Sequence, residues 1–170
     1  MDDRRLRFEV QALPHLDAAY NLARWLAPAM ADDIVQEAML RAWRAFDGFH
    51  GDNVRPWLLA IVRNCRNDAL AEAHRRAHVP LPSTEDGELV DGAPNPEEAA
   101  SSASDQRTLD DALTALPEEF REVLILREME DLSYREIAEV IGAPIGTVMS
   151  RLSRARAMLK ETWMTNNALR

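Results

Sequence analysis

The residues of this chain whose types and spacing could carry out chemistry lie in its last third. After Gly-Ala-Pro at positions 142–144, Thr147, Ser150, Arg151 and Arg154 recur at a spacing that places them on one side of a helix. Hydroxyl groups bond to phosphate oxygens, and arginine either grips guanine with two hydrogen bonds or holds a phosphate. The pattern is therefore typical of a surface that binds nucleic acid.

A helix-turn-helix is predicted to position these side chains. Ser133 and Glu136 have the spacing of a capping box, so a first helix begins at Ser133. Gly142 ends that helix, and Pro144 suits the opening of the next one. The faces that pack together carry apolar residues at helical spacing: Tyr134, Ile137, Ala138, Ile141, Val148, Leu152, Ala155 and Leu159. In a helix-turn-helix the second helix enters the DNA major groove.

The alternative to DNA binding is an ordinary surface hairpin of two helices with a solvated basic face. Charge separates the two interpretations. Residues 146–170 hold five basic side chains and one acid, whereas residues 110–139 hold ten acids and three arginines. This concentration of positive charge on the second helix favours DNA binding.

Composition predicts an all-α fold. Only six of the 170 residues are glycine, and apolar residues recur at helical spacing rather than in alternation. The chain has no apolar run of about 18 residues and no secretory signal, so we expect a cytoplasmic protein without membrane insertion. Its single cysteine excludes an internal disulfide and a cysteine-based zinc cluster. No catalytic constellation or phosphate-binding loop is present, so we expect no enzymatic activity, metal or cofactor.

Two small helical domains joined by a flexible acidic linker are predicted. The linker, residues 78–104, holds four prolines, six acids and no basic residue, and it lacks the apolar residues needed to fold. Fully extended it would span about 90 Å, and as a coil roughly 30 Å. The domains are residues 1–77 and 105–170. Because one turn of DNA is about 34 Å long, the linker would let the two domains reach separate turns.

The first domain is predicted to contain three helices, at Phe8 to about Leu26, Asp32 to about Phe46, and about Arg55 to Arg76. Their buried stripes are Leu13, Leu16, Ala19, Tyr20 and Ala23; Ile34, Val35, Ala38, Ala42, Trp43 and Phe46; and Leu58, Ile61, Val62, Cys65 and Ala69. The second domain adds a helix from Asp105 to Ala115 and another from Pro117 before the helix-turn-helix.

The net charge of −9 is unusual for a chain that binds DNA, because neutralisation of phosphates drives such binding. Residues 1–77 are balanced, with eleven basic and eleven acidic side chains, and residues 105–170 hold nine basic and twelve acidic ones. We therefore expect weak binding to isolated DNA unless a partner presents the chain to it.

Two stretches of the chain resemble bacterial sigma factors. Asp32–Trp43 together with Phe49–Asp68 resembles their second conserved region. Leu116 onward, through the helix-turn-helix, resembles their fourth region. The short segment between them leaves no room for other regions, so the chain resembles an extracytoplasmic-function (group IV) sigma factor.

This resemblance implies a subunit that binds core RNA polymerase, directs it to promoters and helps to melt the duplex. Its implied partners are the β′ clamp helices and the β flap of the polymerase, promoter DNA, and an anti-sigma factor. The polymerase would then supply much of the DNA affinity that the acidic chain lacks.

The resemblance also implies roles for individual residues. Contacts with the clamp helices are carried over to Asp33, Gln36 and Glu37, for which a solvated helix face is the alternative. The contacts with the −10 element correspond to Asp52, Asn53, Trp57 and Asn64. Arg63 is expected to hold a phosphate there, for which a solvated helix face is the alternative. Asn64 occupies the position that contacts a flipped base, and Trp57 could instead be a core residue. Contacts with the −35 element are carried over to Thr147, Ser150, Arg151 and Arg154. Met149 departs from many relatives, which carry a basic residue there.

Two other functions would use the same motifs. One is a stand-alone helix-turn-helix regulator, which would need tight operator binding without polymerase. The other is a sigma-like mimic that sequesters an anti-sigma protein, for which Arg151 and Arg154 would be dispensable.

Overall fold

Every regular element is helical in the residues that the structure describes. The structure is a computed structural model, and it describes residues 3–77 and 100–168. The first range contains α1 (Asp3–Gln11), α2 (Leu16–Leu26), α3 (Ala31–Ala45) and α4 (Val54–Ala77), with short 3₁₀ turns at Leu13–His15, Pro28–Met30 and Phe46–Gly48. The second range contains α5 (Ala100–Ala115), α6 (Glu118–Leu124), a π-helical segment (Ile125–Met129), α7 (Tyr134–Ile141) and α8 (Ile145–Ala168). The predicted all-α class is confirmed.

The first predicted helix is divided in two. A single helix from Phe8 to Leu26 was expected, but the structure ends α1 at Gln11 and begins α2 at Leu16. Pro14 lies between them, and proline has no N–H to continue a helical hydrogen-bond ladder. As a consequence Leu13, predicted to be buried, is 43 % exposed.

The other predicted helices agree with the structure to within a few residues. The expected helices at 32–46 and 55–76 correspond to α3 and α4, and the helix expected from Pro117 corresponds to α6. The helix expected from Asp105 begins earlier, at Ala100. Most of the predicted linker, residues 78–99, lies outside the described residues.

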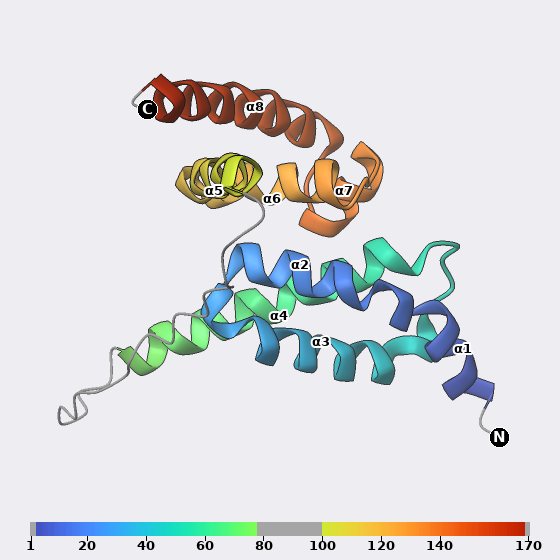
Figure 1. Ribbon diagram of the computed structural model, residues 1–170. Coiled ribbons are helices and arrows are strands. Elements are labelled where there is room, and N and C mark those ends of the chain that lie inside the picture. Colours follow the sequence, from blue (N-terminus) through green and yellow to red (C-terminus); the bar gives the residue numbers. More distant parts are fainter. Residues whose placement is uncertain (1–2, 78–99, 169–170) are drawn as a thin grey trace.

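The helices stack in layers, as Figure 1 shows. α8 lies across α5, α6 and α7, and this group lies over α2 and α4, with α3 on the far side. Contacts between the two halves of the chain are made mainly by α7 against α4 and by α6 against α2. The two halves are therefore packed together.

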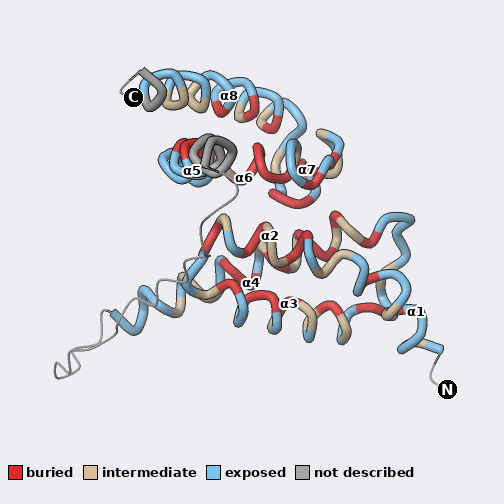
Figure 2. The backbone as a smooth tube through the Cα atoms, in the orientation of Figure 1, coloured by how far each residue is buried: buried red, intermediate tan, exposed pale blue. Residues whose placement is uncertain are grey.

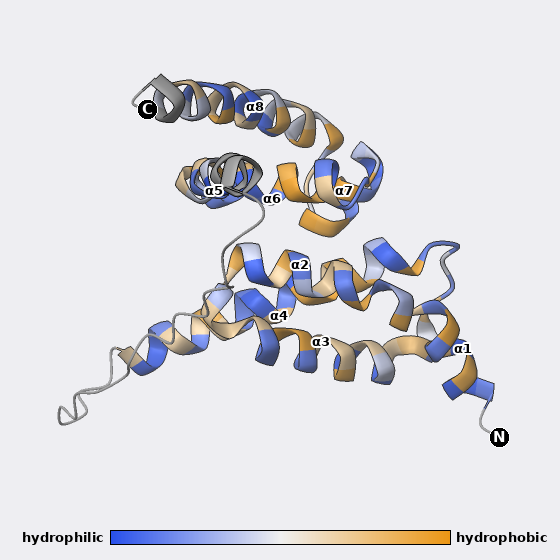
Figure 3. Cartoon of the chain, viewed as in Figure 1, coloured by the Kyte–Doolittle hydropathy of each residue, from blue (hydrophilic) through white to orange (hydrophobic). Residues whose placement is uncertain are grey.

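A single apolar cluster runs through both halves. It includes Leu22 and Val35 from the first half and Leu126, Ile137 and Leu152 from the second, all almost completely buried. Figure 2 shows buried segments on α2, α4 and α6, and Figure 3 shows hydrophobic colour on α6 and the segment that follows it. At roughly 25 cal/mol per Å² of apolar surface, this burial stabilises the packed arrangement.

A smaller cluster lies at the other end of the first half. Phe8 packs edge-on against Trp43 and Phe46, with ring centroids 5.2 Å apart in both pairs. Val54 and Leu58 complete this cluster. It fixes the loop that precedes α4 against α1 and α3.

Candidate nucleic-acid interface

The helix-turn-helix is formed by α7 and α8, and its local signals are those expected. The Ser133 hydroxyl accepts a hydrogen bond from the Glu136 backbone N–H at 3.2 Å, and the Glu136 carboxylate accepts one from the Ser133 N–H at 2.8 Å. Gly142 ends α7 in the left-handed conformation, at φ 64° and ψ 38°. Pro144 then accepts the first hydrogen bonds of α8 through its carbonyl. The predicted capping box and turn are confirmed.

One side of α8 packs inward and another faces solvent. Val148, Leu152 and Ala155 are buried as predicted. On the outer side Ser150 and Arg154 are exposed. The Ser150 hydroxyl donates to the Thr147 carbonyl of the same helix at 3.0 Å, so this face remains open to solvent.

The remaining residues of this face are partly engaged. Thr147 is half-buried, and Arg151 forms an ion pair with Glu119 at 3.3 Å. Met149 is 53 % exposed beside them. The structure thus brings all four predicted −35 residues onto the first turns of α8, with Met149 as an apolar neighbour.

A pocket of about 440 Å³ opens where the 49–53 loop enters α4. Phe49 and Trp57 lie against each other, with ring centroids 4.8 Å apart, and form one side of it. Asp52 and Asn53 line it as well, so three of the predicted −10 residues meet here. Flat aromatic faces beside an amide and a carboxylate can stack on a base and bond to its edge.

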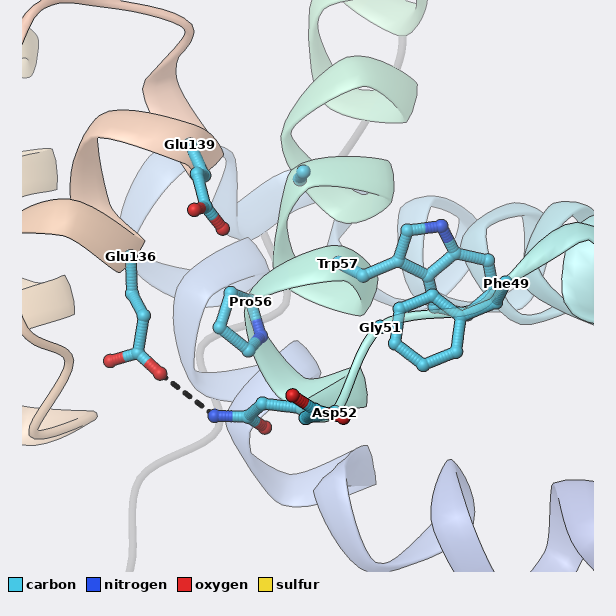
Figure 4. A pocket seen from close by; sticks show the side chains of 9 residues that line it. Phe49, Gly51, Asp52, Pro56, Trp57, Glu136 and Glu139 are labelled. Atoms are coloured by element: carbon cyan, nitrogen blue, oxygen red, sulfur yellow. Dashed lines mark hydrogen bonds between the residues drawn. The ribbon is translucent and has the colours of Figure 1, made fainter.

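Asn53 also positions the pocket. Its side-chain oxygen accepts a hydrogen bond from the Arg55 backbone N–H at 3.1 Å, directly before the first turn of α4. This is the geometry by which asparagine caps a helix. The same amide donates to Glu136 of α7 at 2.8 Å, as the dashed line in Figure 4 shows.

The other two predicted −10 residues do not line the pocket. Asn64 is exposed on α4, two helical turns after Trp57 and on the same side of the helix. Arg63 is half-buried and donates to the Glu122 carboxylate of α6 at 2.7 Å. Asn64 therefore extends the face of α4 that begins at the pocket, whereas Arg63 contacts the second half of the chain.

A groove of about 790 Å³ runs between α3 and α4. Asp33 and Glu37 lie along its rim, while Gln36 is exposed on α3 outside the groove. Glu37 accepts from Arg41 at 2.7 Å, and Arg41 also bonds to Asp68 of α4 at 2.6 Å. All three residues predicted to bind the polymerase thus lie on α3, and the charge of Glu37 is partly neutralised by Arg41 of the same helix.

Cys65 lies on the floor of the same groove. Burial raises the pKa of its thiol, so the uncharged form predominates there. The residue packs as a small apolar side chain, as predicted.

The sequence did not reveal the acids that reach across from the second half. Glu136 contacts Asn53, Glu130 accepts from Arg55 at 2.6 Å, and Glu122 accepts from Arg63. The excess of acids in residues 110–139 was the only signal available, and it carried no information on their partners.

Neither a metal site nor a membrane-spanning helix is found in the described part of the chain. Residues 3–77 and 100–168 hold no group of three histidine, cysteine or acidic side chains arranged for a metal. No helix in these ranges has the length and apolarity to cross a bilayer.

Two family models match this chain. Sigma-70 region 2 matches residues 13–76, and Sigma-70 region 4 matches residues 106–159. The ECF RNA polymerase sigma-E factor of Haemophilus influenzae is 34% identical over 146 residues, which is 82% of this chain and 77% of that protein. The chain belongs to the extracytoplasmic-function (ECF) family of RNA polymerase sigma factors. The resemblance drawn from the sequence is confirmed.

Two further comparisons agree with this membership. The RNA polymerase sigma-H factor of Pseudomonas aeruginosa is 38% identical over 133 residues, covering 74% of this sigma factor and 69% of its relative. The sigma factor RpoE of Bartonella quintana, solved in complex with the anti-sigma factor NepR, superposes with a TM-score of 0.70 at 28% identity. That match covers 95% of this chain and 97% of RpoE. Sigma factors are in general non-catalytic subunits of the cytoplasmic transcription machinery.

Proposed function

We propose that residues 1–77 form a region 2 domain that binds core RNA polymerase and the melted −10 element. Asp33, Gln36 and Glu37 contact the β′ clamp helices from the outer side of α3. The −10 nontemplate strand binds along the loop before α4 and the adjoining face of that helix. Its contacts are made by Asp52, Asn53, Trp57, Arg63 and Asn64.

Residues 105–170 form a region 4 domain that recognises the −35 element. α8 enters the major groove, and Thr147, Ser150, Arg151 and Arg154 contact its bases and phosphates. This domain also contacts the β flap of the polymerase. Residues 78–104 join the two domains and let them reach two separated promoter elements.

The observation that supports this proposal is that one chain presents two separate surfaces whose side chains suit nucleic acid. One is the exposed face of α8 with Ser150 and Arg154. The other is the aromatic pocket formed by Phe49 and Trp57 at the start of α4. A stand-alone regulator needs the first surface alone, and a mimic of an anti-sigma target needs neither.

In vitro transcription of fragmented genomic DNA by core polymerase, with and without this sigma factor, tests the proposal. We expect transcripts that start at a shared two-part promoter and depend on the added chain. Replacing Asn64 with Ala should lower the yield from such a promoter about tenfold, through weaker capture of the melted strand. Unchanged transcription in the Asn64 variant would contradict its role.

Polymerase binding is tested with Asp33→Ala, using Asp17→Ala as the matched control. Both acids are exposed in the first turn of a helix, so both substitutions remove the same charge and the same helix-dipole interaction. We expect Asp33→Ala to weaken binding to core enzyme about five- to tenfold and Asp17→Ala to leave it unchanged. If the two substitutions weaken binding to core enzyme equally, α3 does not form part of the polymerase interface.

We further infer that an anti-sigma factor controls this protein. We also infer that this sigma factor acts in the cytoplasm and has no enzymatic activity of its own. The solved complex of its relative RpoE with an anti-sigma factor supports the first of these inferences. Co-purification from native cells tests it, since polymerase subunits and an inhibitor should be recovered together.

A further inference from the structure

The pocket at the start of α4 is closed in part by the second half of the chain. Glu136 and Glu139 of α7 line it together with Asn53 and Trp57, and Figure 4 shows both carboxylates reaching toward it. The Glu136 carboxylate accepts a hydrogen bond from the Asn53 amide. A base edge bound at this amide would have to displace that carboxylate.

Three further contacts join acids of the second half to arginines of the first. Arg63 bonds to Glu122 at 2.7 Å and Arg55 to Glu130 at 2.6 Å, and Arg66 pairs with Glu118. Glu118 and Glu122 belong to α6, and Glu130 directly follows the π-helical segment. An acidic face of the second half thus covers a basic face of α4, as a phosphate backbone would.

Two of these acids are buried by the contact. Glu122 is 3 % exposed and Glu130 is 4 % exposed. A carboxylate loses its hydration when it is buried, and only a partner that donates hydrogen bonds compensates that cost. Glu130 has two such partners in the first half, Arg55 and Asn21, the latter at 2.6 Å. These acids are therefore adapted to the closed arrangement of the two halves.

We propose that the sigma factor inhibits itself: in the free chain, α6 and α7 cover the Asn53 and Arg63 side of the −10-binding surface, next to the exposed Asn64, and the −10 strand binds fully there only after the halves separate. The inference rests on the proposed function, because it takes the loop before α4 and Arg63 as contacts for the −10 strand. The occupant of this surface is the chain's own second half, with Glu122 at Arg63 and Glu136 at Asn53 in the places of nucleic-acid groups.

The expected size of the effect follows from the population of the open state. The apparent affinity for a ligand falls by the fraction of molecules able to bind it. Minor states of such equilibria are commonly populated at about 10 % or less. Opening the chain should therefore tighten binding of a −10 strand by at least about tenfold.

A reversible crosslink tests closure directly. The Asn21 side-chain nitrogen lies 3.7 Å from the Met129 sulfur, across the boundary between the halves, and neither residue is assigned a contact with polymerase or DNA. We would replace both with cysteine in a Cys65→Ala background and oxidise the full chain. Oxidation to a disulfide, or a short bis-methanethiosulfonate whose spacer tolerates imperfect geometry, should join the two cysteines, and reductant cleaves both crosslinks.

The crosslinked and reduced forms are then compared. The probe is a single-stranded oligonucleotide with the nontemplate −10 sequence of a promoter mapped by the transcription experiment above. We expect the crosslinked chain to lose binding to this probe and reductant to restore it. With core enzyme, the reduced form should transcribe and the oxidised form should not.

A second variant opens the chain instead. Glu122→Gln with Glu130→Gln keeps side-chain volume but removes both buried charges. Asp111→Asn with Glu161→Gln is the control, because both acids are exposed in the same half and the net charge changes equally. The interface variant should bind the probe at least about tenfold more tightly than the control.

Different results separate the inference from the proposed function. Three outcomes would each overturn self-inhibition alone. The cysteines could fail to crosslink with either reagent, the crosslinked and reduced chains could bind the probe equally, or the two double variants could have equal affinities. Failure of the reduced cysteine variant and the original chain to transcribe with core enzyme would overturn the proposed function, and the inference with it.

Discussion

The Glu136 carboxylate accepts a hydrogen bond from the Asn53 amide at 2.8 Å, although 83 residues separate the two in the chain. The same carboxylate completes the capping box of α7 with the Ser133 N–H. One side chain therefore starts the first helix of the helix-turn-helix and contacts the loop before α4. A change in its charge acts on both.

We expect Glu136 to make stability dependent on pH. The hydrogen bond from the Ser133 backbone lowers its pKa below the ordinary value of 4.5, and the Asn53 amide acts in the same direction. Because the folded pKa lies below the unfolded one, the unfolded chain binds more protons in between, so stability rises with pH there. The contribution is complete above the unfolded pKa and is lost as pH falls through the folded pKa.

Glu136→Gln isolates this contribution, since glutamine still forms a capping box but does not titrate. The free energy of unfolding of the two proteins, measured in urea at several pH values, should differ above pH 4.5 and converge in acid. A difference that stays constant across this range would show that the carboxylate charge is unimportant.

Replacing glycine with alanine should have opposite effects on stability at the two ends of the turn. Gly142→Ala places a side chain on a residue with φ of +64°, so we expect a loss of about 1 kcal/mol. Gly146→Ala lies within α8 with open space around the new Cβ and should stabilise the protein by up to about 1 kcal/mol. Urea denaturation of both variants measures these changes, and a Gly142→Ala variant as stable as the original protein would contradict the assignment of Gly142 as the cap.

The local signals of the helix-turn-helix could be predicted from sequence because each depends on residues three or four apart. The spacing of Ser133 and Glu136 and the position of Gly142 were sufficient to place α7. Pro14 was an equally local signal. The apolar stripe on both sides of it favoured one continuous helix, and the structure shows two.

Contacts between distant parts of the chain could not be predicted in the same way. Arg63 and Glu122 are 59 residues apart, and no periodicity links them. Arg63 was therefore assigned only a contact with DNA. The residues of the −10 pocket were found through family resemblance, whereas its aromatic wall needed the geometry of Phe49 and Trp57.

Arg154 and Arg156 should differ in their importance for the −35 element. Arg154 is exposed on the outer face of α8, while Arg156 bonds to Glu128 at 2.8 Å. We expect Arg154→Ala to lower transcription from a promoter with an intact −35 element about tenfold and to have little effect when that element is scrambled. Arg156→Ala removes the same charge and serves as the control, so equal losses would contradict a specific contact by Arg154.

Met149 is the residue of the α8 face that departs from a basic pattern, and a substitution there should change the salt dependence of binding. It is 53 % exposed, so an arginine can replace it without repacking the core. One added phosphate contact should steepen the slope of log affinity against log salt by about 0.9. We would measure this slope for holoenzyme on promoter DNA with Met149→Arg. Met164→Arg is the matched control, because Met164 is 59 % exposed on the same helix but lies four turns or more further from the turn. If both variants steepen the slope equally, the added charge acts through the general field of the protein, and the first turns of α8 do not lie against the phosphates.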